Sequence, residues 1–259
     1  MIVGAAVCPC PPVLVRELTG QTEVLPELRA ACAAAVARLT AAAPDVIVVA
    51  GAGQQTGGWP ARARLDLAAY APGLAASGRG DGALAGTALA GTPGLPLSLG
   101  VGARLLDEAG YAGSRALHGI AALAPPADCL RLGARLAASA PRVALLAMGD
   151  GSARRSVSAP GYLDERAGPF DAAVERAVRD GDLAALAALD PGLAAELLAP
   201  GRPAWQVLAG ALGADGGTAG GGTAGGTALV PEILYCGAPL GVGYLVAAFT
   251  APPAGAARS

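Results

Sequence analysis

The sequence contains no lysine, and all 18 basic side chains of the 259-residue chain are arginines. These arginines are scattered, the formal net charge is -2, and the sequence has no basic stripe. This charge distribution argues against a nucleic acid partner. The longest apolar runs, near residues 46–49 and 244–249, are far too short to span a membrane. We therefore expect neither a nucleic-acid-binding nor a membrane protein.

Histidine and aromatic side chains are also scarce. His118 is the single histidine, aromatic residues make up 3% of the chain, and charged residues 15% against 53% hydrophobic residues. A chain of this length can bury a substantial core, which must consist mainly of Ala, Leu and Val. The apolar N-terminus lacks a basic region and stops at residues 8–12, which argues against a signal peptide. Five cysteines without a regular framework favour a cytoplasmic protein.

Hydrophobic periodicity predicts alternating strands and helices. We expect strands at 1–7, 46–50, 116–120, 143–148, 232–235 and 243–249, and helices at 25–39, 98–108, 127–138, 163–178, 183–189, 193–198 and 205–212. The first strand–helix–strand unit implies parallel neighbouring strands joined by a right-handed crossover. The predicted fold is a single α/β domain over residues 1–259, with a mostly parallel or mixed central sheet flanked by helices.

Two segments interrupt this pattern. Residues 52–96 are rich in Gly, Pro and Ala and only weakly periodic, so we expect an irregular insertion. Residues 215–228 consist mainly of Gly, Thr and Ala, which cannot bury large side chains. This second segment is predicted to be a flexible surface loop.

The most informative stretch is Met-Gly-Asp-Gly-Ser-Ala-Arg-Arg at residues 148–155. It follows a predicted buried strand, and the carboxyl ends of such strands are where open α/β sheets usually bind ligands. Its candidate site residues are Asp150, Ser152 and Arg154. Backbone N–H groups of a Gly-rich turn, together with arginine, would suit a carboxylate or another anion. A metal-free enzyme using Asp150 and Ser152 is one alternative.

The same stretch has a structural interpretation. Asp150 would then cap the turn, and the two arginines would pair with carboxylates that follow, namely those of Asp164, Glu165 or Asp171. These two interpretations stay open at the level of sequence.

Cysteines provide a second candidate site. Cys8 and Cys10 are two residues apart, so in an extended segment their side chains share a face. With Cys236 as a third ligand they could bind Cu(I) or Zn. The alternative is that they are small buried hydrophobic residues.

Three segments, taken in order, resemble a known family. They are residues 7–12, residues 149–155 running on to Phe170 and Asp171, and residues 240–244. They resemble the class III extradiol ring-cleavage dioxygenase superfamily, the LigB-like proteins, and especially its small actinobacterial branch. The superfamily also includes Memo-type proteins, which share the fold without ring-cleaving activity. The resemblance therefore implies a LigB-like α/β fold more strongly than a function.

The resemblance also implies where an iron site would lie. Enzymes of the family hold Fe(II) with two histidines and one carboxylate, and a further histidine serves as acid and base. The first ligand position is occupied here by Cys10, and the acid/base position by Ala153. The second ligand position falls at Gln54 or Gln55. Glu232 would match the carboxylate. Because both histidine ligand positions carry other residues, the facial triad looks lost.

We therefore expect a LigB-like protein with its iron ligands replaced, acting as a non-catalytic or functionally diverged binding protein. Its expected pocket contains Cys10, Gln54, Gln55, Asp150, Ser152 and Arg154. No metal or other cofactor is predicted, no catalytic residue is assigned, and the expected ligand is small and anionic or aromatic. The oligomeric state stays open. A second alternative is an oxygenase with an atypical metal site built from Cys10, Gln54 or Gln55, Glu232 and Cys236.

Overall fold

The computed structural model describes the whole chain except residues 21, 66, 68–69, 71–93, 214–227 and 253–259. The strands are β1 (Ile2–Cys8), β2 (Val46–Gly53), β3 (Gly57–Trp59), β4 (Ser114–Ala121), β5 (Val143–Met148), β6 (Val230–Gly237) and β7 (Tyr244–Thr250). The helices are α1 (Arg16–Thr19), α2 (Pro26–Ala41), α4 (Leu97–Glu108), α5 (Pro126–Ala137), α6 (Ala167–Asp180), α7 (Leu183–Ala187), α8 (Pro191–Glu196) and α9 (Arg202–Ala211), with a 3-10 turn η1 (Pro12–Leu14).

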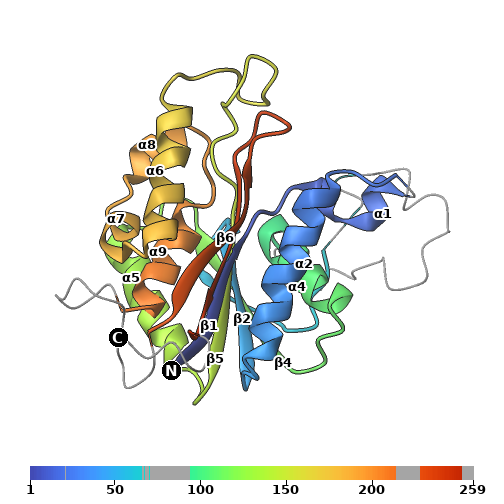
Figure 1. Ribbon diagram of the computed structural model, residues 1–259, viewed down its shortest axis with the longest axis vertical. Coiled ribbons are helices and arrows are strands. Elements are labelled where there is room, and N and C mark those ends of the chain that lie inside the picture. The colour runs from blue at the N-terminus through green and yellow to red at the C-terminus, as the bar shows by residue number, and fades with distance from the viewer. Residues whose placement is uncertain (21, 66, 68–69, 71–93, 214–227, 253–259) are drawn as a thin grey trace.

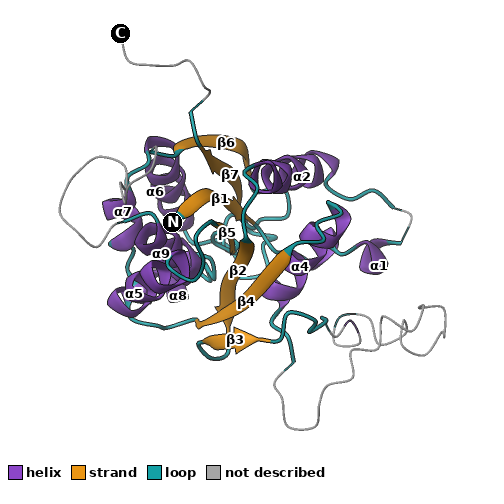
Figure 2. Ribbon diagram, turned by 90° about the horizontal axis from the view of Figure 1, so that it is seen from below, coloured by secondary structure: helices purple, strands orange, loops and turns teal. Residues whose placement is uncertain are grey.

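The strands form one mixed sheet in the order β3-β4-β2-β5-β1-β7-β6. The central strands β4, β2, β5 and β1 are parallel, whereas β3, β7 and β6 pair in antiparallel fashion. Helices cover both faces of this sheet (Figure 2). The expected fold class, α/β with a mixed central sheet flanked by helices, is confirmed.

The neighbours of β1 differ from the prediction. We expected β1 and β2 to be adjacent, but β5 lies between them and pairs with both in parallel, Ala147 being opposite Val7 on one side and Ala50 on the other. Every residue of β5 is buried. A strand that is apolar throughout suits the middle of a parallel sheet, where both faces are covered by helices.

Each face of the sheet has its own apolar core. One lies under α2 and α4, and the other lies under the layer formed by α5, α6, α7, α8 and α9 (Figures 1 and 2). Because side chains alternate along a strand, Ala5 and Val7 of β1 face the α5–α9 layer, whereas Ala6 and Cys8 face α2 and α4. This alternation directs the Cys8 side chain to the α2 face.

The connections after β1 and β5 leave the sheet on opposite faces. The chain runs from β1 to α2 on one face and from β5 to α6 on the other, and both loops lie at the same end of the sheet (Figure 1). Adjacent parallel strands with this arrangement form a topological switch point, the usual ligand position in open α/β sheets. We call this place the β1/β5 switch point and define it by residues 8–10 and 148–150.

Two predicted boundaries need correction. Within the expected irregular insertion 52–96, β2 extends to Gly53, and residues 57–59 form the edge strand β3, in which Trp59 pairs with Leu117 of β4. The expected helix 163–178 begins only at Ala167, and before it the Asp164 side chain accepts from the Arg166 amide at 2.9 Å in a local turn. Residues 71–93 and nearly all of the loop 215–228 lie outside the described residues.

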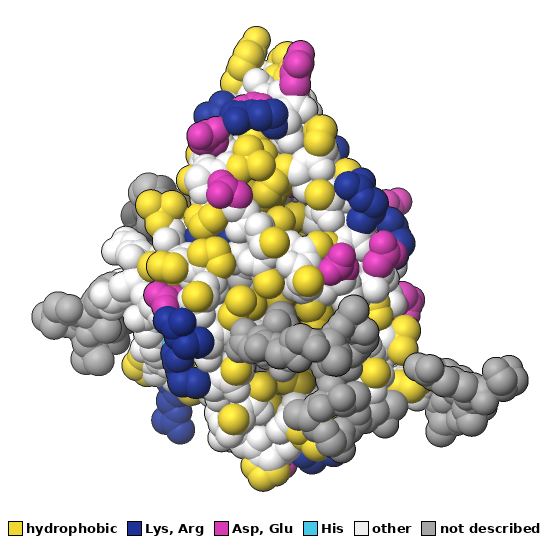
Figure 3. Space-filling view, turned by 90° about the vertical axis from the view of Figure 1, so that its left-hand side faces the viewer, with side chains coloured by type: hydrophobic (Ala, Val, Ile, Leu, Met, Phe, Trp, Pro, Cys, Tyr) yellow, Lys and Arg dark blue, Asp and Glu magenta, His cyan; other side chains and the backbone are white. Residues whose placement is uncertain are grey.

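The surface of the α5–α9 layer carries ion pairs between its elements. Arg166 pairs with Asp164 and, at 2.7 Å, with Glu196, which joins the start of α6 to α8. Arginine and acidic side chains are interspersed over the upper part of this face (Figure 3). Among the described residues, no helix has the length and apolar character needed to cross a membrane.

Candidate functional site

The loop after β5 is fixed by backbone contacts on three sides. The Gly149 amide donates to the Cys8 carbonyl at 2.9 Å, and the Gly151 amide donates to the Gly243 carbonyl at 2.7 Å. The Asp150 carbonyl accepts from the amide of Gly201, 2.9 Å away at the start of α9. A Cβ atom on Gly149 would lie 2.3 Å from the Gly201 Cα atom, so only glycine permits this approach. The loop therefore holds Asp150 in a defined position.

Asp150 connects the two strands of the switch point. Its Oδ1 atom accepts a hydrogen bond from the Cys10 amide at 2.7 Å. Burial raises the pKa of Asp150 from 3.8 to about 6, although the hydrogen bonds from Cys10 lower it. The described groups that shift the pKa of Asp150 include no arginine, so no positive charge among them offsets the effect of burial. The sequence correctly placed Cys10 and Asp150 at one end of the sheet, and the structure brings them into direct contact.

The thiols and the phenol around Asp150 are neutral. Burial raises the pKa of the Cys10 thiol, and the Asp150 carboxylate raises it further. The pKa of the Cys8 thiol is raised first by its hydrogen bond with Cys32 of α2 and then by burial. Burial also raises the pKa of Tyr244, as do the charges of Asp150 and Cys10. The switch point thus combines one carboxyl group with neutral hydrogen-bonding groups.

Ser152 serves the structure of the loop. Its side chain is fully buried, and Oγ donates to the Leu197 carbonyl at 2.7 Å while it accepts from the Arg154 amide at 3.1 Å. The Ser152 amide donates to Asp171 Oδ1 at 2.9 Å. A fully buried hydroxyl that already donates one hydrogen bond and accepts another is a poor nucleophile. This geometry argues against the metal-free enzyme built on Asp150 and Ser152.

Of the two arginines of the loop, Arg155 follows the structural interpretation of the sequence. Arg155 Nη1 donates to Asp171 Oδ2 at 2.8 Å, and both groups are partly buried. The charge of Arg154 contributes to the lowered pKa of Asp164, although the hydrogen bonds from Arg166 are the main cause. Arg155 therefore serves a carboxylate of the chain itself, whereas the Arg154 Nε atom is buried and finds no hydrogen-bond partner among the described residues. The ion pair with Asp171 leaves Arg155 without a free charge for the expected anion.

The two glutamines lie apart from Cys10. Gln54 and Gln55 are exposed and follow β2, which β5 separates from β1. With neighbouring strands about 4.8 Å apart, the ends of β1 and β2 are roughly 10 Å apart. The structure thus brings Cys10 and Asp150 together but shows no contact that joins the glutamines to them.

The other proposed ligands are also dispersed. Glu232 lies on β6 opposite Ala248, and it forms an ion pair with Arg38 at 2.9 Å. His118 lies on β4, where burial lowers its pKa. Cys236 lies beside Glu175 of α6, on the face of the sheet opposite Cys8, so the expected trio of Cys8, Cys10 and Cys236 does not converge.

The donor groups do not fit a ferrous facial triad. In the part of the chain that the structure describes, no three His, Cys, Asp or Glu side chains are grouped so that they could hold a metal ion. The switch point supplies only the Cys10 thiol and the Asp150 carboxyl, whereas the triad needs two imidazoles and one carboxylate. Among the described residues, the donor groups at the switch point therefore do not match the iron site that the resemblance implies.

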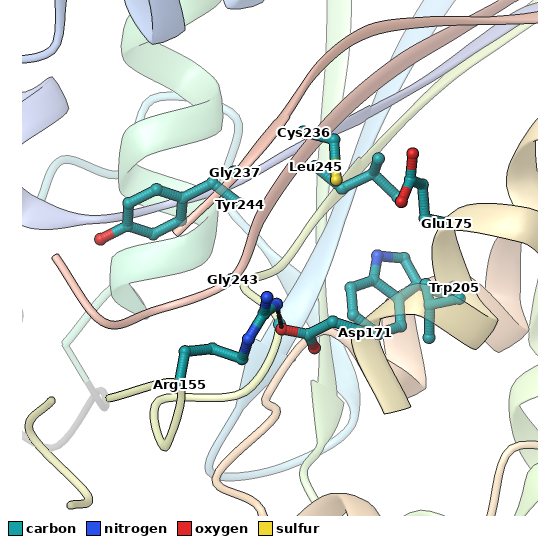
Figure 4. A pocket seen from close by; sticks show the side chains of 11 residues that line it. Arg155, Asp171, Glu175, Trp205, Cys236, Gly237, Gly243, Tyr244 and Leu245 are labelled. Carbon is teal, nitrogen blue, oxygen red and sulfur yellow. Dashed lines mark hydrogen bonds and ion pairs between the residues drawn. The ribbon is translucent and has the colours of Figure 1, made fainter. Parts of the chain in front are cut away.

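A small pocket lies next to the loop, between α6, α9 and the β6–β7 hairpin (Figure 4). Its polar lining includes Arg155, Asp171, Glu175, Trp205 and Cys236. The pocket has a volume of about 20 Å³. A single water molecule needs about 10–15 Å³ by the same measure. It can therefore accept a small group but not an aromatic ring.

Sequence reasoning missed this pocket. Trp205 was expected to be a core residue, and it is 1% exposed, but it also lines the pocket. The spacing of Asp171 and Glu175, four residues apart on one helix, was the available signal, because such residues share a face. The pocket itself could not be predicted, since its walls come from separate parts of the chain.

No family model matches this sequence, and no curated protein resembles it significantly.

Proposed function

We propose that this protein is a functionally diverged LigB-like binding protein, which holds a small aromatic ligand at the β1/β5 switch point without iron-dependent ring cleavage. The observation that carries this proposal is the 2.7 Å hydrogen bond from the Cys10 amide to Asp150 Oδ1. It occupies the position where the family resemblance places the first iron ligand. The Cys10 thiol stands there in place of the first histidine that the resemblance implies, and the Asp150 carboxyl lies beside it.

The chemistry of the switch point favours an uncharged ligand. Asp150 has no basic partner among the described groups that shift its pKa, so a ligand anion beside it would be repelled. The hydroxyl of a phenol or catechol can instead donate to the Asp150 carboxylate. The Tyr244 phenol, which is neutral, offers a further hydrogen bond.

Metal analysis and oxygen uptake test the loss of iron chemistry. Protein purified without chelators should contain no stoichiometric metal, and with added Fe(II) it should consume no oxygen on protocatechuate. The Cys10→His variant should also bind no iron, because one imidazole and Asp150 leave the triad without its third ligand. Adding Gln54→His should give weak binding at most, since no built set of partners orients these rings. Oxygen uptake by the unmodified protein would overturn the proposal.

Melting temperatures test ligand binding itself. Catechol, which is neutral, should raise the melting temperature because it binds the native state alone, whereas protocatechuate, an anion, should raise it less. The Asp150→Asn variant should lose most of the catechol effect, and Asp180→Asn, at an exposed position of α6, should keep it. An equal catechol effect in both variants would place the ligand elsewhere.

A further inference from the structure

The pocket beside α6 contains a buried hydrogen-bond donor without a partner. Trp205 is 1% exposed, and its Nε1–H group finds no acceptor among the described residues. Figure 4 shows the indole nitrogen on the side of the ring that faces Glu175 and Cys236. Buried polar groups are nearly always hydrogen-bonded, so a donor left open beside a cavity indicates an acceptor that the described residues do not supply.

The charges around the pocket are already balanced. Arg155 pairs with Asp171 at 2.8 Å, and Arg179 pairs with Glu175 one helical turn away. The Cys236 thiol is neutral, because burial and the neighbouring Glu175 raise its pKa to about 11. A charged ligand would therefore enter without a free counter-ion, which is costly in a partly buried site. These pairs favour an uncharged ligand group.

The pocket nevertheless offers both kinds of hydrogen bond. Trp205 Nε1–H can donate, and the carboxylate oxygens of Glu175 and Asp171, which lie on either side of the indole in Figure 4, can accept. Val174 and Leu245 supply apolar walls. A group that carries an oxygen acceptor next to an N–H donor matches this arrangement, and the volume of about 20 Å³ limits it to a few atoms.

We propose that this pocket, the Trp205 pocket, is a second binding site, which takes the neutral carboxamide end of a small molecule. The amide oxygen accepts a hydrogen bond from Trp205 Nε1, and the amide NH₂ group donates to Glu175. This site is centred on Trp205 and Glu175 and needs no ligand at the switch point, although Tyr244 also lines it.

Indole resonances provide a direct test, since the chain has only two tryptophans, Trp59 and Trp205. In ¹⁵N-labelled protein, the Trp59→Phe variant identifies the Trp205 indole signal. Titration with acetamide should move this signal downfield and saturate in the millimolar range, as expected for so small a ligand. The Trp59 signal of the unmodified protein should stay in place.

Two further probes separate the carboxamide from other ligands. N,N-Dimethylacetamide keeps the oxygen but lacks N–H donors, so it should bind about tenfold more weakly. Acetate should bind less still because of its charge. Equal shifts with acetate or dimethylacetamide, or no saturable shift with acetamide, would overturn the proposal. The last result would mean that the pocket holds water alone.

Variants test the acceptor and separate this proposal from the function proposed above. Glu175→Leu should weaken acetamide binding about tenfold, whereas Glu165→Leu, at an exposed position before α6, should leave it unchanged. Unchanged affinity in Glu175→Leu would contradict the assigned acceptor. Asp150→Asn should keep the full acetamide response, so failure at the switch point and failure at the Trp205 pocket remain distinguishable.

Discussion

At the scale of single residues, Asp150 is a buried carboxyl group in a fixed position, and its burial costs stability when it is ionised. Its carboxyl group accepts from the Cys10 amide but has no basic partner among the described groups that shift its pKa. Burial therefore dominates and raises its pKa to about 6. Ser152, two residues on, has its hydroxyl fully engaged by the backbone, which shows that adjacent polar residues of one loop serve different purposes.

The raised pKa of Asp150 predicts a pH-dependent effect of one substitution. Because the folded-state pKa lies above the ordinary value of 3.8, the native state keeps the proton longer, and this contribution to stability is lost as the pH rises through 6. The rise corresponds to at most about 3 kcal/mol, since one pKa unit is about 1.4 kcal/mol. Asp150→Asn keeps an acceptor for Cys10 without the charge. It should be more stable than the unmodified protein by about 1–3 kcal/mol at pH 8.

This gain in stability should disappear near pH 4, where the Asp150 carboxyl group of the native protein is protonated and therefore uncharged, like the Asn side chain. Urea unfolding at pH 4, 6 and 8 measures the difference between the two proteins. Asp180→Asn, at an exposed position, serves as the control. A gain of equal size at pH 4 and pH 8 would show that ionisation of Asp150 is not its cause.

At the scale of elements, α5 and α9 pack with their backbones in contact. A Cβ atom on Gly133 of α5 would lie 2.1 Å from the Val207 carbonyl oxygen of α9. On the other helix, a Cβ atom on Gly210 would lie 2.1 Å from the Leu130 carbonyl oxygen. Two glycines that face the partner helix therefore permit this close crossing, which also places α9 and its Trp205 against the sheet.

Adding one methyl group at this crossing should separate the helices. Gly133→Ala is expected to lower the free energy of unfolding by about 1–3 kcal/mol, because overpacking outweighs the better helix propensity of alanine. Gly168→Ala near the start of α6 is the control, since its added Cβ meets no atom within 4 Å apart from its own helix backbone and its chain neighbours. Because Pro169 follows and disfavours a helical residue that carries a Cβ, that variant should change the free energy of unfolding by no more than about 1 kcal/mol. A loss no larger in Gly133→Ala than in Gly168→Ala, measured by urea unfolding, would contradict the close crossing.

At the scale of the whole molecule, the first residues of the chain occupy the middle of the sheet. β1 lies between β5 and β7, and its residues from Gly4 to Cys8 are buried. β6, from a late part of the chain, forms one edge of the sheet. Stability should therefore depend far more on the N-terminal strand than on this edge.

A valine-to-alanine substitution in β1 and another in β6 test whether stability depends more on the central strand than on the edge strand. Val7→Ala, where the side chain is fully buried under the α5–α9 layer, should cost about 2–3 kcal/mol of unfolding free energy. Val230→Ala in β6, where the side chain is 51% exposed, should change it by no more than about 0.5 kcal/mol. Comparable losses in thermal or urea unfolding would mean that the edge strand is covered by a further contact.

The sequence by itself determined the elements and one part of the site. Periodicity located the β1, β5 and β7 strands and the α2, α4 and α5 helices, because burial of an element's face requires apolar residues at regular spacing in the sequence. Placing Cys10 and Asp150 after two parallel strands was enough to predict that they lie at one end of the sheet. This inference needed only strand direction, which connection lengths indicate.

Only the tertiary structure decided which strands are neighbours and what each polar side chain contacts. Periodicity reports which face a residue occupies but not which strand lies beside it, so the position of β5 between β1 and β2 could not be foreseen. The direction of Ser152 depends on the Leu197 carbonyl, 45 residues away along the chain. The Trp205 pocket likewise joins α6, α9 and the β6–β7 hairpin. Contacts of this kind arise from packing between distant segments, and no local pattern in the sequence encodes them.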